Sequence, residues 1–92
     1  GYAARRGVGR GGRRRRRYDT LMPVEFTVHA RMRMSERHVL QSDVMIALAE
    51  PDDIRYGEDG ELIARKRLGR RVVEVVFVES HATRRVITVI VG

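Results

Sequence analysis

The chain has 92 residues, no cysteine and a net charge of +7. This length allows one domain with a small core, and the lack of cysteine excludes a disulfide framework or a thiolate metal site. No apolar run approaches the roughly 18–20 residues that cross a bilayer, and the start lacks the apolar segment of a secretory signal. We therefore expect a cytoplasmic protein with no membrane partner.

The excess positive charge lies entirely in residues 1–23. This segment holds eight arginines and one acidic residue, Asp19, whereas residues 24–92 hold eleven basic and eleven acidic side chains. Rich in arginine and glycine and poor in apolar residues, the segment cannot bury a core, and we expect it to be a disordered leader. One interpretation is an arm that binds nucleic acid in a salt-dependent way. The other is an inert extension, because Met22-Pro23-Val24 resembles a native start.

Residues 24–92 are expected to form one domain that begins with a short extended entry and a helix. Apolar and polar side chains alternate over residues 24–28, and Thr27 is then a suitable N-cap for a helix over about 28–37. At about 100° per residue, Ala30 and Met34 share the stripe that faces the core. His29, Arg33 and Arg37 lie beside that stripe.

A second helix is predicted over about 42–50. Asp43 is favourable in its first turn, and Pro51 ends the helix because a residue before proline disfavours helical angles. Its apolar side chains are Val44, Ile46, Ala47 and Leu48.

After Pro51 the apolar period changes to two, which indicates strands. Residues 54–56 and 61–66 flank the turn 57–60 as a hairpin, and strands follow at about 72–79 and 85–91. The predicted fold class is α+β, with the two helices packed on a four-stranded antiparallel meander.

The helix motif resembles a known family. Residues His29-Ala30, Arg33-Met34, Arg37 and Val39, followed by Asp43-Val44 and Pro51, match a bacterial family of unknown function with the pattern HAxxRMxxRxI. That family is similar to the BrnT and RelE type toxins, small ribonucleases of toxin–antitoxin modules. Over about residues 25–91 the resemblance implies their fold, RNA as substrate, either free or on the ribosome, and a cognate antitoxin as partner. The sequence departs from these toxins because it stops at Gly92, where they commonly continue into a functional tail.

Metal-independent RNA cleavage requires a base, an acid and a cation that stabilises the pentacoordinate phosphorus. We assign these catalytic roles to His29, Arg33 and Lys66, because histidine and a perturbed lysine can transfer protons near neutral pH and arginine binds two phosphate oxygens at once. Glu74, which interrupts an apolar strand, and His81, in a loop beside Arg84 and Arg85, are further candidates for the same cleft. The predicted nucleic-acid contacts are Arg37, Arg65, Arg67 and Arg84, with Arg13, Arg14 and Arg15 in the leader.

Each assignment has a purely structural alternative. His29 can bond a backbone group near the helix start, and Arg33 and Arg37 can pair with nearby carboxylates. Residues 65–67 can form a solvated strand edge, Glu74 can face outward or pair with an arginine, and His81 can be an ordinary loop residue. His29 and His81 lack the spacing and companion ligands of a zinc site, so no metal or cofactor is expected.

Three hypotheses for function remain open. The leading one is a toxin-like endoribonuclease. The second is a non-catalytic nucleic-acid-binding module in which the arginine-rich leader supplies most of the affinity. The third is a protein–protein interaction domain, with Val28 and Met32 marking the partner face. The oligomeric state does not follow from the sequence.

Overall fold

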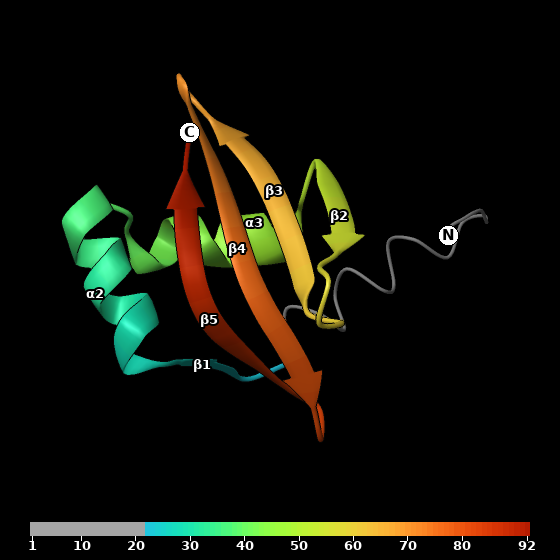
Figure 1. Cartoon of the computed structure of the whole chain (residues 1–92). Helices are drawn as coiled ribbons and strands as arrows, with labels where there is room; N and C mark the ends of the chain where they lie inside the picture. Colours follow the sequence, from blue (N-terminus) through green and yellow to red (C-terminus); the bar gives the residue numbers. More distant parts are fainter. Residues whose placement is uncertain (1–21) are drawn as a thin grey trace.

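The computed structural model describes residues 22–92 as one sheet with both helices on the same side (Figure 1). The helices are α2 (Val28–Arg37) and α3 (Gln41–Ala49), close to the ranges predicted for them. The strands are β1 (Val24–Phe26), β2 (Asp53–Tyr56), β3 (Leu62–Leu68), β4 (Arg71–Ser80) and β5 (Thr83–Val91). The fold is α+β. The predicted leader lies almost wholly outside the described residues.

The predicted four-stranded antiparallel meander is wrong, because the sheet has five strands and is mixed. Its strand order is β1-β5-β4-β3-β2, and β1 runs parallel to β5, with Val24 opposite Arg84 and Phe26 opposite Val86. The other three pairs are antiparallel. The residues predicted as an extended entry form β1, which is too short to stand out as a strand when the mean length is about 5–6 residues.

The parallel pair has a physical cause in the backbone groups that flank β1. The N–H of Thr27 donates to the carbonyl of Val86 (3.1 Å), and the N–H of Arg84 donates to the carbonyl of Pro23 (3.0 Å). Val24 and Phe26 pack against the core, so this segment is drawn beside β5, where its polar groups find partners.

A single core fills the space between the helices and one face of the sheet. The prediction that Ala30 and Met34 face it is confirmed, since both are buried. Ala30 has no exposed surface, and its small side chain lets the helix lie close to the sheet. The other buried members are Val39, Val44, Ala47, Leu48, Ala64, Val73, Val75, Phe77, Val86 and Val89.

Thr27 joins the start of α2 to β5. Its hydroxyl oxygen accepts from the N–H of Ala30 (3.0 Å), which confirms the predicted N-cap, and its hydroxyl donates to the carbonyl of Ile87 (3.0 Å). Ile87 is the extra residue of a bulge in β5, since Val76 lies opposite Thr88 and Phe77 opposite Val86. The bulged carbonyl is thus satisfied by the helix cap.

Arg71 fixes the other end of α2. Its guanidinium donates to the carbonyl of Arg37 (3.1 Å) and to that of His38 (3.2 Å). His38 takes the left-handed conformation that ends the helix (φ 57°). A cation at a helix C-terminus also interacts favourably with the helix dipole, so Arg71 ties α2 to the start of β4.

Replacing Thr27 by Ala is expected to lower the free energy of unfolding by about 1–2 kcal/mol, the usual cost of losing a threonine N-cap. Urea unfolding followed by circular dichroism measures this. Ser42→Ala is the matched control, because Ser42 is exposed in the first turn of α3 and its side chain has no hydrogen bond within residues 22–92. Equal effects of the two substitutions would contradict the role of Thr27.

Candidate nucleic-acid interface

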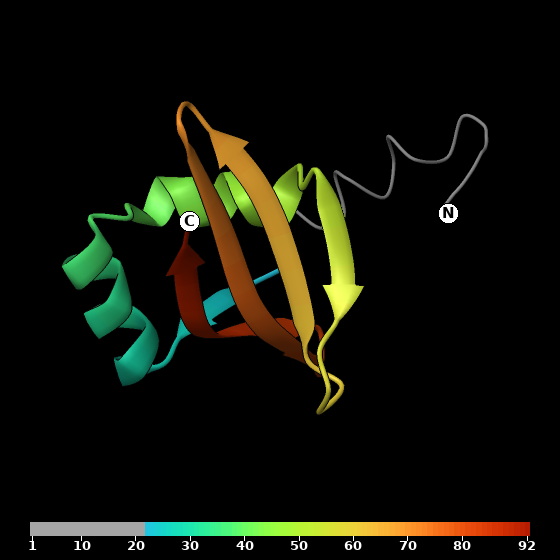
Figure 2. The same ribbon diagram turned by 45° about the horizontal axis from the view of Figure 1, so that its top comes forward.

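The face of the sheet opposite the helices carries both charged and apolar side chains. We call it the open face, because no helix of residues 22–92 covers it (Figures 1 and 2). Strand alternation and the register of the strand pairs define its members. They are Glu25 of β1, Asp53 and Arg55 of β2, Ile63, Arg65 and Arg67 of β3, Val72, Glu74, Val76 and Val78 of β4, and Arg85, Thr88 and Ile90 of β5.

Three charged side chains from three adjacent strands meet on the open face. We call Arg55, Arg65 and Glu74 the Glu74 cluster. An Nη2 group of Arg55 donates to Glu74 Oε2 (3.1 Å), and Arg65 Nε lies 3.9 Å from the same oxygen. Arg65 is directly opposite Glu74 across the β3–β4 pair. The Glu74 side chain is only 20% exposed, whereas both arginines are about half exposed, so the carboxylate lies beneath two guanidinium groups.

Next to the Glu74 cluster, Asp52 binds two residues of β3. Its Oδ2 atom accepts from the N–H of Arg67 (2.8 Å), and its Oδ1 atom lies 3.5 Å from Lys66 Nζ. A hollow of about 150 Å³ lies here, lined by Asp52, Arg65, Arg67 and Val72. Among the described residues the Arg67 guanidinium has neither an ion pair nor a hydrogen bond, so it is available to an anion.

The surroundings of Asp52 favour its ionised form. The hydrogen bond from the N–H of Arg67 lowers the pKa of Asp52 below its ordinary value of 3.8, although desolvation opposes this effect. The positive charges of Lys66 and Arg65 lower the pKa further.

The three residues predicted as catalytic lie on elements that are not neighbours. His29 and Arg33 belong to α2, which packs on β5 and β1, whereas Lys66 belongs to β3, separated from β5 by β4. His29 is exposed, Arg33 lies 3.7 Å from Glu36 on the next turn, and Lys66 is paired with Asp52. The structure therefore brings Lys66 to the basic end of β3 but leaves His29 and Arg33 away from it.

The predicted nucleic-acid contacts are also divided. Arg65 and Arg67 lie on the open face, and Arg37 is exposed at the end of α2. Arg13, Arg14 and Arg15 lie outside the described residues. Among the further candidates, Glu74 is the partner of two arginines, and His81 is exposed in the turn between β4 and β5.

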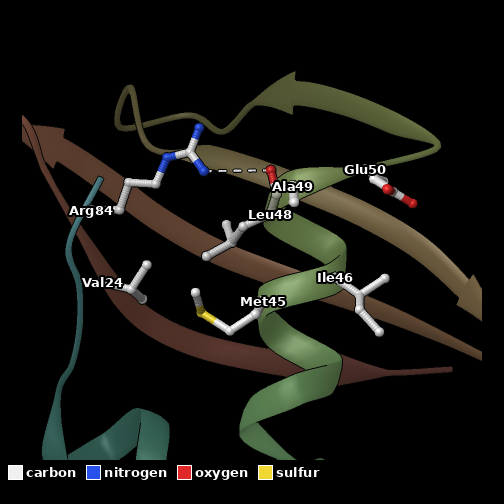
Figure 3. Close-up of a pocket in the computed structure, with 7 residues that line it drawn as sticks. All are labelled: Val24, Met45, Ile46, Leu48, Ala49, Glu50 and Arg84. Atoms are coloured by element: carbon white, nitrogen blue, oxygen red, sulfur yellow. Dashed lines mark hydrogen bonds between the residues drawn. The ribbon is translucent and has the colours of Figure 1, made fainter. Parts of the chain in front are cut away.

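Arg84 lies on the helix side and is 5% exposed. It donates to Glu79 Oε2 (3.1 Å) and to the carbonyl of Leu48 (3.4 Å), and its guanidinium lies 5.5 Å from the centre of the Phe77 ring. Figure 3 shows it at the side of an apolar pocket of about 290 Å³ between β1 and α3. The pocket is lined by Val24, Met45, Ile46, Leu48, Ala49, Glu50 and Arg84. Arg84 thus stabilises the fold instead of presenting its charge to a surface ligand.

Sequence reasoning missed Arg55 and Asp52, and it gave an arginine partner for Glu74 only as an alternative, without saying which arginine. The available signal was the hairpin turn at residues 57–60, which fixes the register that brings Asp53 opposite Arg65 and Arg55 opposite Ile63. Extending that register to β4 places Arg65 opposite Glu74. The cluster was therefore open to deduction once the strand pairing was assumed.

No group of three or more histidine, aspartate or glutamate side chains within residues 22–92 is arranged to hold a metal ion. Neither helix there is both long and apolar enough to cross a membrane.

The chain belongs to the family described as "Domain of unknown function (DUF4258)", whose model matches residues 26–91. Comparisons with curated proteins and with solved structures found no match. The family match runs from Phe26, the last residue of β1, to the end of β5. It carries no described activity, so the similarity to BrnT and RelE type toxins stays a prediction.

The lowered pKa of Asp52 predicts how stability changes with pH. The folded state binds a proton on the Asp52 carboxylate more weakly than the unfolded state does. Ionised Asp52 therefore stabilises the fold above pH 3.8, and this stabilisation is lost as the pH falls through the lower, folded-state pKa. Asp52→Asn should thus be less stable than the wild type at neutral pH, and the difference should vanish in acid. Unfolding at a series of pH values tests this, and a difference that is constant with pH would contradict it.

Proposed function

We propose that this domain binds single-stranded RNA on its open face, in the cytoplasm. The observation that carries the proposal is the convergence of Arg55, Arg65 and Arg67 on a sheet face that no described helix covers. The planar guanidinium fork matches the oxygens of a phosphate. Unpaired RNA can lie across a sheet with its backbone along basic side chains and its bases on the strand residues.

The charge balance of the open face supports this choice. The face holds four arginines and three carboxylates: Glu74 is shared by Arg55 and Arg65, Glu25 is paired with Arg85, and Asp53 lies opposite Arg65. Arg67 has no ionic partner among the described residues. An arginine has five N–H donors, so Arg55 and Arg65 keep donors for phosphate while they hold Glu74. Lys66 and Asp52 neutralise each other. The open face therefore keeps an excess of one positive charge, four arginines against three carboxylates, although residues 24–92 as a whole are neutral.

The apolar residues of the open face can contact RNA bases but cannot distinguish one base from another. Val72, Val78 and Ile90 lie on this face next to the charged row, with Ile90 about half exposed. Aliphatic side chains contact the flat surface of any base and offer no hydrogen bonds to its edge. We therefore propose weak sequence preference.

A second candidate function, RNA cleavage of the toxin type, is supported by the position of Glu74. The Glu74 carboxylate can accept a proton, and the two guanidinium groups beside it can stabilise the negative charge of a pentacoordinate phosphorus. In this proposal Glu74 takes the proton of the 2′-hydroxyl while the 2′-oxygen forms a bond to phosphorus. The bond from phosphorus to the 5′-oxygen breaks, and that oxygen takes a proton from water. A cognate antitoxin would silence the activity by covering the open face.

The double variant Arg65→Ala/Arg67→Ala tests RNA binding. Fluorescence anisotropy with a single-stranded oligonucleotide should show weaker binding, and the slope of log K against log salt should fall by about 0.7 for each lost phosphate contact. The control is Arg70→Ala/Arg33→Ala, which removes the same charge from exposed or partly exposed arginines away from the Glu74 cluster. Equal effects of the two double variants would show that only overall charge matters.

Glu74→Gln tests cleavage separately from binding. If Glu74 is the base, this variant should lose about 10²–10⁴-fold in rate while it still binds RNA, whereas His29→Ala should cleave at the wild-type rate. Cleavage is followed on labelled RNA, with and without ribosomes. Undiminished cleavage by Glu74→Gln would remove Glu74 as the base. A wild-type protein that binds but never cleaves would leave only the first function.

A further inference from the structure

The exposed edge of the sheet at β2 has features of a self-association surface. Strand β2 is the last strand of the sheet and, within residues 22–92, is hydrogen-bonded to β3 alone. All four of its residues are exposed, including Ile54 (45%) and Tyr56 (76%). An edge strand presents unpaired N–H and carbonyl groups that another strand can pair with, and exposed apolar residues on it favour such pairing.

The hydrogen bonds of the β2–β3 pair show which backbone groups face outward. The N–H of Gly57 donates to the carbonyl of Glu61 (2.8 Å), directly after the pair of Tyr56 with Leu62. In an antiparallel pair every second residue directs its N–H and carbonyl to the partner strand. Counting back from Gly57, Arg55 and Asp53 direct their backbone N–H and carbonyl groups to β3. Ile54 and Tyr56 direct theirs to the free edge.

The charges of β2 are complementary to those of a second copy. We propose that the edge of β2 pairs antiparallel with β2 of another molecule, with Ile54 opposite Ile54 of the partner subunit. In this register the outward groups of the two Ile54 residues exchange both hydrogen bonds. Asp53 then lies opposite Arg55 of the partner subunit, and Arg55 opposite Asp53 of the partner subunit. These two pairs take the non-hydrogen-bonded positions, where side chains are closest, at about 4.5 Å between Cα atoms.

Charge also disfavours the neighbouring register. Shifting the two-fold axis from Ile54 to Arg55 keeps the backbone pattern, since Ile54 would then exchange hydrogen bonds with Tyr56 of the partner subunit. It would place Arg55 opposite Arg55 of the partner subunit, and like charges in that position are destabilising. The charges of Asp53 and Arg55 therefore favour the register centred on Ile54.

A two-fold axis perpendicular to the sheet keeps each face on its own side. The open faces of both subunits would form one surface with two Glu74 clusters, while Ile54 meets its counterpart on the helix side. Because β2 is short, the contact is smaller than the roughly 1,600 Å² of a standard interface, so the dimer should depend on concentration. This inference does not rest on the proposed function.

Sedimentation velocity over a dilution series of the full chain tests the pairing. The wild type should shift from monomer to dimer with rising concentration, and Ile54→Pro should stay monomeric. Proline removes the outward N–H, which β3 does not use, and is tolerated on edge strands. Ile54→Thr, the control, keeps the N–H and should still dimerise. A wild type that is monomeric throughout, or a dimer unaffected by Ile54→Pro, would overturn the proposal.

A charge exchange separates the pairing from any loss of folding. Asp53→Arg alone and Arg55→Asp alone should each raise the dissociation constant of the homodimer by about tenfold or more, because like charges face each other. Mixed together, the two variants regain opposite charges at both positions and should form a heterodimer. If the folded variants, checked by circular dichroism, do not associate when mixed, the register is wrong.

Discussion

The constraint on which the rest of the structure depends is that two short helices can cover only one face of the sheet. A chain of this size builds a single small core, and here that core lies between α2, α3 and alternate residues of the strands. The opposite face has no helix of the described residues over it. Its side chains must therefore be stable at a surface, and their charges are free to meet ligands.

The partners of the charged residues depend on which face of the sheet each residue occupies. Glu74 lies in a strand that is otherwise almost wholly apolar, and its position points it to the open face. A carboxylate with only 20% of its side chain exposed requires compensation, which Arg55 and Arg65 provide. On the helix side the same need is met differently, because the buried Arg84 is held by Glu79 and the carbonyl of Leu48. Arginines on the two faces of the sheet thus have different roles.

Local sequence patterns correctly predicted the structural features that depend only on residues close together in the chain. The N-cap at Thr27 and the buried stripe of Ala30 and Met34 follow from helical geometry, and both are found. The parallel pairing of β1 depends on a strand about 60 residues further along, and no local period contains it. The placement of His29 and Arg33 away from Lys66 depends on tertiary packing in the same way: helical spacing gives the face of α2 but not the strands on which α2 lies.

The central claim is that RNA binds on the open face, and mapping the binding by NMR tests it most directly. A single-stranded oligonucleotide would be titrated into ¹⁵N-labelled protein at several salt concentrations while the backbone amide shifts are followed. The account predicts the largest salt-sensitive changes at Arg65, Arg67 and Glu74, on β3 and β4, with α2 and α3 little affected. Changes confined to α2, to α3 or to residues 1–21 would contradict it.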